Sequence, residues 1–156
     1  MLYRLYSEVD FPALYAIEEV CFAPPLRFGR GMMRRLIGCP NSATWIAERD
    51  GAMAGFGIVE WDTEAGETVA YLETIEVLPE LRGMGVGYEL LRRLDKSACE
   101  AGAVAIGLHV DAENTVAIGL YEAHGFALKG RQEDYYGSGR AALIYSKRLG
   151  ARAAGL

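Results

Sequence analysis

The sequence has little of what a metal centre or a disulfide scaffold requires. It contains only two histidines and three cysteines, and Cys21, Cys39 and Cys99 are far apart along the chain. Their spacing fits no metal-ligand motif, and three cysteines leave no complete set of disulfides. We therefore expect no metal, and a reducing, cytoplasmic compartment.

Long apolar runs and an excess of basic residues are missing as well. No apolar stretch approaches the roughly 20 residues that a membrane-spanning helix needs, and the first ten residues lack the apolar core of a secretory signal. Sixteen basic residues against 21 acidic ones give a net charge of −5, which disfavours a nucleic-acid binder. The one basic cluster (Arg27, Arg30, Arg34 and Arg35) is interpreted as a solvated helix face, with an anion or substrate site as the alternative. We expect neither a membrane nor a nucleic acid as partner.

What the chain does have is apolar residues and glycine. At 156 residues and 51% hydrophobic content it can bury the core of one domain, which we place at residues 1–149, with 150–156 as a frayed tail. Glycine accounts for 19 residues, about 12% against an average near 7%, with no collagen-like repeat. Such a surplus indicates turns, helix ends or a loop that contacts a ligand.

The hydrophobic pattern predicts an α/β fold. Strands are expected at 2–6, 44–49, 52–61 and 69–78, with a hairpin turn at Asp50-Gly51 and a polar loop at 62–67. Helices are expected at 11–21, capped by Asp10, and at 28–37. A helix at 85–101, a strand at 103–110, a helix at 115–124 and a hairpin of strands 126–136 and 141–147 follow. The strand–helix–strand unit implies one parallel pair, so the expected architecture is a mixed, mostly antiparallel sheet with about four helices.

A glycine-rich turn, Arg82-Gly-Met-Gly-Val-Gly-Tyr88, separates the strand at 69–78 from the next helix. Glycines let the backbone approach a ligand there, and the N–H groups of the first helical turn favour an anion such as a pyrophosphate. The spacing G-x-G-x-G matches neither the Rossmann fingerprint nor the P-loop. A tight turn without any ligand is the simpler alternative.

Two motifs in this region carry a family resemblance. Arg82-x-x-Gly85-x-Gly87, preceded by Val77-x-Pro79, resembles the acetyl-CoA signature of the GNAT superfamily of N-acetyltransferases. Asn114-x-x-Ala117-x-x-Leu120-Tyr121-x-x-x-Gly125-Phe126 resembles the second signature and stands at the expected distance. The segment from Leu108 to Tyr136 further resembles the branch that acetylates protein N-termini, including ribosomal-protein alanine N-acetyltransferases.

The resemblance implies a cofactor site. It implies a splayed parallel strand pair whose V holds the pantetheine arm of acetyl-CoA, with Asn114 on the far side of the V and Tyr121 as the general acid near the thioester sulfur. The remaining implied contacts are the backbone of Ile75, Glu76 and Val77 on the strand, and Arg82, Gly83, Met84, Gly85, Val86, Gly87 and Tyr88 around the pyrophosphate.

The general base stays open between two residues. In the ribosomal branch a glutamate stands where this chain has His109, and histidine can do the same work; a packed histidine at a strand end is the alternative. Glu73 lies in an otherwise apolar strand, where an unpaired buried carboxylate would be costly, unless it occupies a solvent-facing edge. Tyr135 and Tyr136 are candidates for a wall of the acceptor site.

The function predicted from these residues is acetyl transfer from acetyl-CoA to a primary amine, a protein N-terminus or a small molecule. The transfer is expected to be direct, within a ternary complex, without a metal. The alternatives are a non-catalytic acyl-CoA sensor and an ordinary nucleotide-binding domain. Dimers are common in the superfamily, so the resemblance is compatible with a homodimer.

Overall fold

The computed structural model describes residues 1–149, so the predicted frayed tail lies outside the described part of the chain. Its strands are β1 (Leu2–Leu5), β2 (Ser42–Arg49), β3 (Ala52–Glu64), β4 (Glu67–Val77), β5 (Ala103–Asp111), β6 (Ala127–Gln132) and β7 (Ala142–Arg148). Its α-helices are α1 (Phe11–Cys21), α2 (Arg30–Gly38), α3 (Val86–Glu100) and α4 (Thr115–Ala123), with short 3-10 turns at Glu8–Asp10 and Pro79–Leu81. The strands form one sheet in the order β1-β2-β3-β4-β5-β7-β6.

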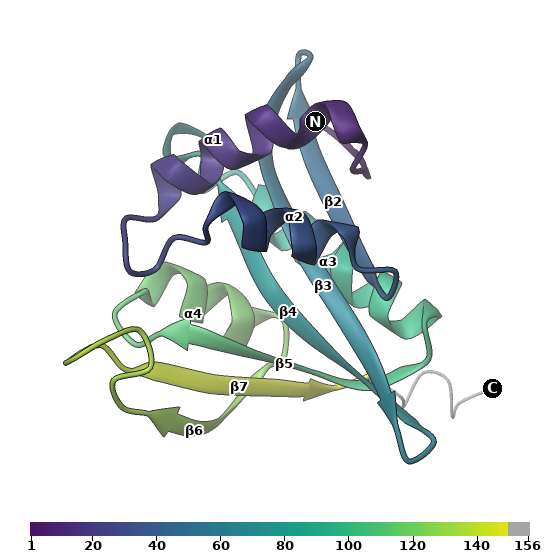
Figure 1. Ribbon diagram of the computed structural model, residues 1–156, viewed down its shortest axis with the longest axis vertical. Coiled ribbons are helices and arrows are strands. Elements are labelled where there is room, and N and C mark those ends of the chain that lie inside the picture. The colour runs from purple at the N-terminus through teal and green to yellow at the C-terminus, as the bar shows by residue number, and fades with distance from the viewer. Residues whose placement is uncertain (150–156) are drawn as a thin grey trace.

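The sheet confirms the predicted fold class. Neighbouring strands are antiparallel except β4 and β5, which are parallel. Helix α3 connects this pair, as a crossover between parallel strands must. Figure 1 shows α1 and α2 in front of the N-terminal half of the sheet and α3 behind it.

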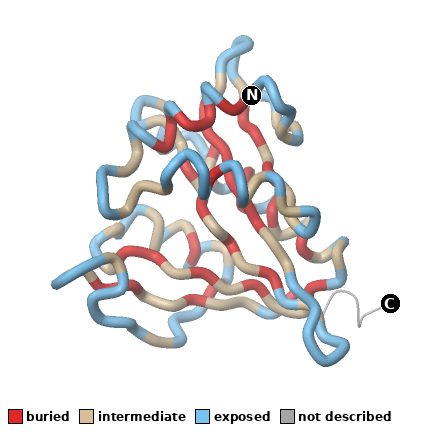
Figure 2. Tube along the Cα trace, in the orientation of Figure 1, coloured by how far each residue is buried: buried red, intermediate tan, exposed pale blue. Residues whose placement is uncertain are grey.

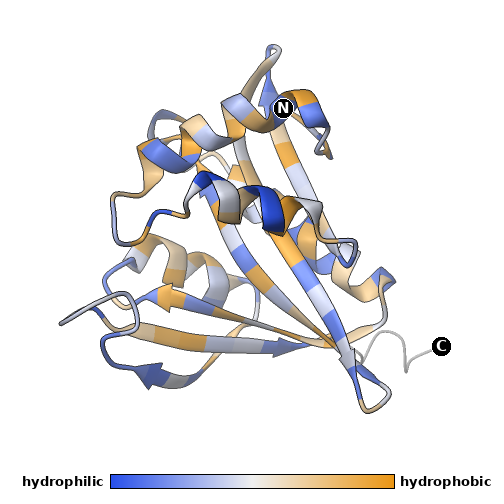
Figure 3. Cartoon of the chain, in the orientation of Figure 1, coloured by the Kyte–Doolittle hydropathy of each residue, from blue (hydrophilic) through white to orange (hydrophobic). Residues whose placement is uncertain are grey.

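Each face of the sheet is covered because its apolar side chains have a helix to pack against. Leu90, Leu91, Leu94 and Ala98 on α3 are fully buried, at the helical spacing predicted for this segment. On the other face, Phe11, Leu14 and Met33 of α1 and α2 pack on Ile46, Phe56 and Ile58 of the strands. Figure 2 shows this burial running along the middle of the strands, and Figure 3 shows apolar and polar residues alternating there.

Two-residue turns with positive φ connect β2 to β3 and β3 to β4. Asp50 and Gly51 have φ of 52° and 81°, which confirms the predicted hairpin turn between β2 and β3. The predicted loop at 62–67 is wrong in extent, because β3 continues to Glu64 and β4 begins at Glu67. Ala65 and Gly66, with φ of 54° and 79°, make a two-residue turn that lets the strands pair almost to their ends.

Two other predictions are wrong because an aspartate side chain binds elsewhere than expected. The strand expected at 126–136 ends at Gln132, because Asp134 turns the chain with a φ of 56° and accepts a hydrogen bond from the N–H of Gly139 at 2.6 Å. Asp10 makes no side-chain cap on α1. Its carboxylate instead receives two hydrogen bonds at 2.8 Å from the guanidinium of Arg4.

Within residues 1–149, no helix is long and apolar enough to cross a membrane. In the same part of the chain, no three His, Cys, Asp or Glu side chains gather in a way that could hold a metal ion.

Candidate acetyl-transfer site

The parallel strands β4 and β5 pair only at their beginnings. Their register runs from Thr68 opposite Ala103 to Tyr71 opposite Gly107. Beyond this point, within the described chain, β4 pairs only with β3 and β5 only with β7. The facing edges of the two strands therefore diverge into a V, as Figure 1 shows between β4 and β5. No neighbouring strand of residues 1–149 binds the main-chain groups that line the V. This is the splay that the family resemblance implies.

The glycine-rich turn stands at the open end of β4, between Pro79–Leu81 and the start of α3. Gly83 and Gly85 have φ of 79° and 83°, a backbone conformation that glycine adopts without strain. A Cβ added at either position would meet no atom within 4 Å, so both positions face open space. The unpaired N–H groups of the first turn of α3 and the positive end of its dipole lie here.

Arg82 fixes this turn to its neighbours. Its Nε donates to the carbonyl of Val77 at 2.9 Å, and its Nη2 lies 3.5 Å from Sγ of Cys21 on α1. Met84 and Tyr88 are exposed, whereas Val86, the first residue of α3, is buried against Ala47 and Ala54. Val86 can therefore offer a ligand only its main chain.

The predicted contacts on β4 divide into backbone and side chain. Ile75, Glu76 and Val77 all lie in the part of β4 that β5 leaves unpaired. The side chain of Glu76 is 3% exposed and faces α1. Across the V, Asn114 caps α4 by accepting a hydrogen bond from the N–H of Ala117 at 3.1 Å, which is sufficient to explain an asparagine there.

Tyr121 is buried where α4 packs on the sheet, with its ring tilted against Phe126 at a centroid distance of 5.7 Å. Burial, and after it Tyr136 and Glu76, raises the pKa of its hydroxyl. The hydroxyl is therefore fully protonated at neutral pH, the state that a proton donor requires.

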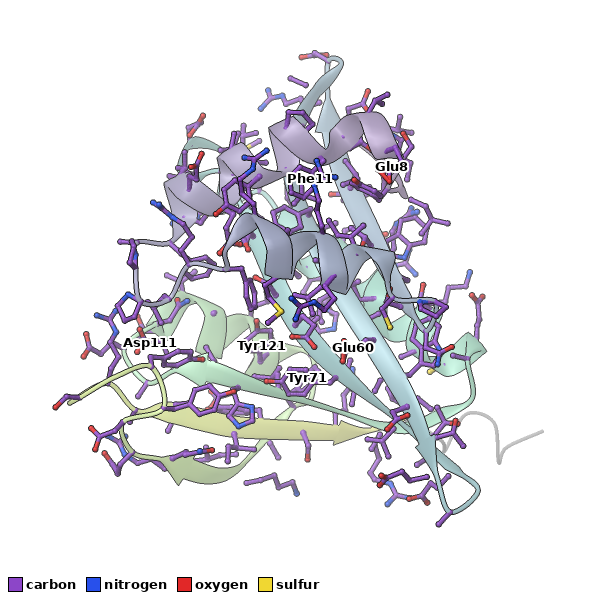
Figure 4. All side chains as sticks on the ribbon, in the orientation of Figure 1. Glu8, Phe11, Glu60, Tyr71, Asp111 and Tyr121 are labelled. Atoms are coloured by element: carbon purple, nitrogen blue, oxygen red, sulfur yellow. The ribbon has the colours of Figure 1, made fainter. Side chains whose placement is uncertain are left out.

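His109 does not stand alone. Its Nδ1 lies 2.7 Å from the hydroxyl of Tyr71, and its ring stacks on Tyr135 at 4.4 Å with an interplanar angle of 7°. Burial, and then Tyr135 and Glu73, raises the pKa of Tyr71, so the phenol keeps its proton. It donates to Nδ1 when the ring proton of His109 is on Nε2. Figure 4 shows Tyr71 and Tyr121 in the region where β4 and β5 diverge.

Glu73 stands at a bulge of β4. The register against β3 shifts at this point, because Thr74 pairs with Ile58 and Leu72 with Val59. Burial, and then the carboxyl group of Glu60, raises the pKa of Glu73 to about 8. Glu73 is thus half-buried beside a second carboxyl group rather than on a solvent-facing edge, and it is largely protonated at neutral pH.

Sequence reasoning missed Tyr71. In the parallel register Tyr71 is opposite Gly107, and His109 is two residues further along β5, so both side chains are on one face of the sheet. Alternation within each strand indicates which residues share a face of that strand. It does not indicate which residues of β4 and β5 lie opposite each other.

Two segments approach each other over this face. The β6–β7 loop carries Tyr135 and Tyr136, whose rings meet edge to face at 4.9 Å. Arg140 ties the loop to β5 by donating to the Asp111 carboxylate at 2.9 and 3.0 Å. A Cβ built at Gly137 would lie 3.8 Å from Cγ of Pro25, so the loop reaches the segment between α1 and α2.

The arginine cluster is less uniform than predicted. The guanidinium groups of Arg30 and Arg34 lie over the ring of Phe11 at 5.3 and 3.8 Å. Arg27 donates to the carbonyls of Phe22 and Glu19. These three arginines therefore stabilise α1, α2 and their connection by packing on aromatic faces and by hydrogen bonds.

The open V and the glycine turn are the features that the two sequence motifs imply, and comparison with known proteins supports the same family. Residues 11–126 match the Acetyltransferase (GNAT) family. The chain therefore belongs to the GNAT acetyltransferase family, as the two motifs predicted.

Individual relatives fit this assignment. The chain is 33% identical over 91 residues to an IAA acetyltransferase of Azospirillum brasilense, and this match covers 58% of the relative's length. It resembles the crystal structure of the ribosomal-protein-S18-alanine N-acetyltransferase from Escherichia coli with a TM-score of 0.81 and 26% identity, over 95% of this chain and 93% of the other. It shares its fold with Arabidopsis thaliana NAA60 in complex with acetyl-CoA, with a TM-score of 0.82 and 20% identity, over 96% and 99% of the chains.

Proposed function

We propose that this protein transfers an acetyl group from acetyl-CoA to a primary amine, directly, within a ternary complex. The observation that carries the proposal is the Tyr71–His109 hydrogen bond at 2.7 Å on the face where β4 and β5 begin to diverge. A V with free main-chain groups can hold an extended pantetheine arm as an added strand would be held. The open space beside Gly83 and Gly85, at the start of α3, suits the pyrophosphate.

The proposed chemistry needs a neutral amine and a protonated leaving group. The amine nitrogen attacks the thioester carbon, and its proton passes to the oxygen of Tyr71 while the Tyr71 proton passes to Nδ1 of His109. The carbon–sulfur bond breaks, and Tyr121 donates its proton to the departing thiolate. Glu73 is the weaker candidate for the base, because its pKa of about 8 leaves it largely protonated at neutral pH.

An α-amine suits this site better than a lysine side chain. Deprotonation near pH 7.4 costs an α-amine under about 1 kcal/mol and a lysine about 4 kcal/mol. A phenol–imidazole pair can accept a proton without being a strong base, which is sufficient for an α-amine. The resemblance to the ribosomal-protein alanine enzyme supports the same class of acceptor, and Tyr135 stacked on His109 offers an aromatic wall for a peptide end.

The test is an acetyl-CoA-dependent screen of a peptide with a free N-terminus, an N-blocked lysine peptide, a polyamine and free amino acids, with mass detection of product. We expect the free N-terminus to be acetylated fastest. Tyr71→Phe and His109→Gln should each lower kcat by about 10²-fold or more with unchanged acetyl-CoA affinity, whereas the control Tyr6→Phe should change neither. Acetyl-CoA binding without turnover of any amine would instead support the sensor.

A further inference from the structure

Two glutamates are buried against each other where α1 crosses β4. Glu18 of α1 is 0% exposed and Glu76 of β4 is 3% exposed. One oxygen of each carboxyl group is satisfied, because Oε2 of Glu18 accepts the N–H of Phe28 at 2.9 Å and Oε2 of Glu76 accepts the hydroxyl of Thr74 at 2.7 Å. The other oxygen of each, Oε1, is buried without a hydrogen-bond partner in residues 1–149.

Helix α1 packs on β4, and the Glu18 carboxyl group is, after burial, the main cause of the raised pKa of Glu76, so the two carboxyl groups are neighbours. Two neighbouring buried carboxylates cannot both be ionised at low cost. A single proton placed between the two Oε1 atoms would give each of them a partner, which removes the cost of both unsatisfied atoms at once.

The groups around the pair favour this proton. Burial and the neighbouring Glu18 raise the pKa of Glu76 well above its ordinary value. Arg82, from the glycine turn, is the cation that opposes this shift, but its guanidinium is exposed and already engaged by Val77 and Cys21. The other titratable neighbours, Cys21 on α1 and Tyr121 on α4, are neutral at pH 7 and leave the pair as it is.

We propose that Glu18 and Glu76 are positioning residues that share one proton, and that the resulting hydrogen bond holds α1 and the segment 22–29 against β4 beside the open V. The segment is tied to α1 at Phe28, whose N–H is bound by Glu18 and whose carbonyl accepts the hydroxyl of Tyr15 at 2.8 Å. Its Pro25 approaches Gly137 of the β6–β7 loop. The shared proton therefore fixes one wall of the proposed acceptor site.

Loss of the proton has a defined sign. The folded pair retains a proton that the unfolded chain releases above pH 4.5, the ordinary pKa of a glutamate. The stabilisation is complete below that pH, declines as the pH rises, and is lost once the pH passes the raised pKa of Glu76 in the folded protein. Each pH unit within this window should raise the unfolding equilibrium constant tenfold for the one proton involved.

The experiment compares wild type, Glu76→Gln, Glu18→Gln and the control Glu19→Gln by urea unfolding between about pH 5 and about pH 9. Glu19 is the exposed neighbour of Glu18 on α1. A glutamine amide donates to the remaining carboxylate at every pH, so the unfolding equilibrium constant of either pair variant should rise ten times less per pH unit than that of wild type and Glu19→Gln. The contribution of Glu73, whose pKa is raised to about 8, is common to all four proteins. Hydrogen exchange at Phe28 should rise with pH beyond the intrinsic rate in wild type and not in Glu76→Gln.

An identical pH dependence in wild type and both pair variants would overturn the proposal. If neither variant folds, infrared spectroscopy of Glu73→Gln supplies the test, because this substitution removes the other glutamate whose pKa is raised. A protonated carboxyl band must still persist above about pH 6, where glutamates of ordinary pKa are ionised. Absence of that band would also overturn it. None of these readouts depends on acetyl transfer, so the pair and the proposed activity can fail separately.

Discussion

Gly85→Ala is the substitution that tests the glycine turn most directly, because the fold supplies a matched control at Gly102. Both glycines have a left-handed backbone, with φ of 83° and 91°, and an added Cβ meets no atom within 4 Å at either. Alanine should therefore cost each variant a similar 1–2 kcal/mol or so of stability from backbone strain alone. Only Gly85 is at the start of α3, where we place the pyrophosphate; Gly102 follows its end.

The methyl group at Gly85 would occupy the space of a phosphate oxygen and displace it from a main-chain N–H. A hydrogen bond to a charged group contributes about 1.5–3 kcal/mol, so acetyl-CoA should bind about 10-fold to 150-fold more weakly. Isothermal titration with acetyl-CoA, beside urea unfolding of both variants, measures the two effects separately. If Gly85→Ala bound acetyl-CoA within about twofold of Gly102→Ala, the assignment of the turn as a phosphate cradle would be refuted.

Three further substitutions test other parts of the site. Glu60→Gln should lower the pKa of Glu73 from about 8. The free energy of unfolding should then fall less in the variant than in wild type as the pH rises toward 8. NMR titration of the Glu73 carboxyl carbon measures the pKa, and an unchanged titration would assign the whole shift to burial. Gly55→Ala places a Cβ 2.4 Å from the carbonyl oxygen of Glu76 and should lower the free energy of unfolding by about 1–3 kcal/mol; a loss under about 0.5 kcal/mol would contradict the packing there. A Cβ added at Gly119 would meet no atom within 4 Å, so Gly119→Ala should stabilise α4 by up to about 1 kcal/mol. The same substitution should weaken acetyl-CoA binding if the cofactor passes close to this helix, and an unchanged affinity would exclude that approach.

The parts of the fold that the sequence predicted well are those decided by local chemistry. The Asp50-Gly51 turn, the stripe of leucines on α3 and Gly102 after its end depend on residues near one another in the chain. The Ala65-Gly66 turn escaped notice because alanine rarely adopts a positive φ, so the polar residues around it resembled a loop. Asp10 had the right position for a cap, but a longer-range partner, Arg4, bound its carboxylate.

The site shows the same division. The glycine turn, Asn114 and Tyr121 belong to contiguous motifs and were found by resemblance. Tyr71 and His109 are 38 residues apart, and their contact depends on the register of two parallel strands. Glu18 resembles any surface glutamate of an amphipathic helix until β4 is packed against it, so its burial could not be inferred from α1 alone.

The open V also bears on how far such sequences can diverge. If the cofactor is bound by main-chain N–H and C=O groups, the side chains of β4 and β5 are free of that task. Apart from Tyr71, Glu73 and His109, they are then constrained by packing. Substitutions that preserve the splay are then neutral for cofactor binding, which is compatible with a shared fold at 20% to 26% identity. Under that reading, selection on cofactor use acts on strand direction and on a few glycines, whereas the choice of acceptor can change through the side chains that face it.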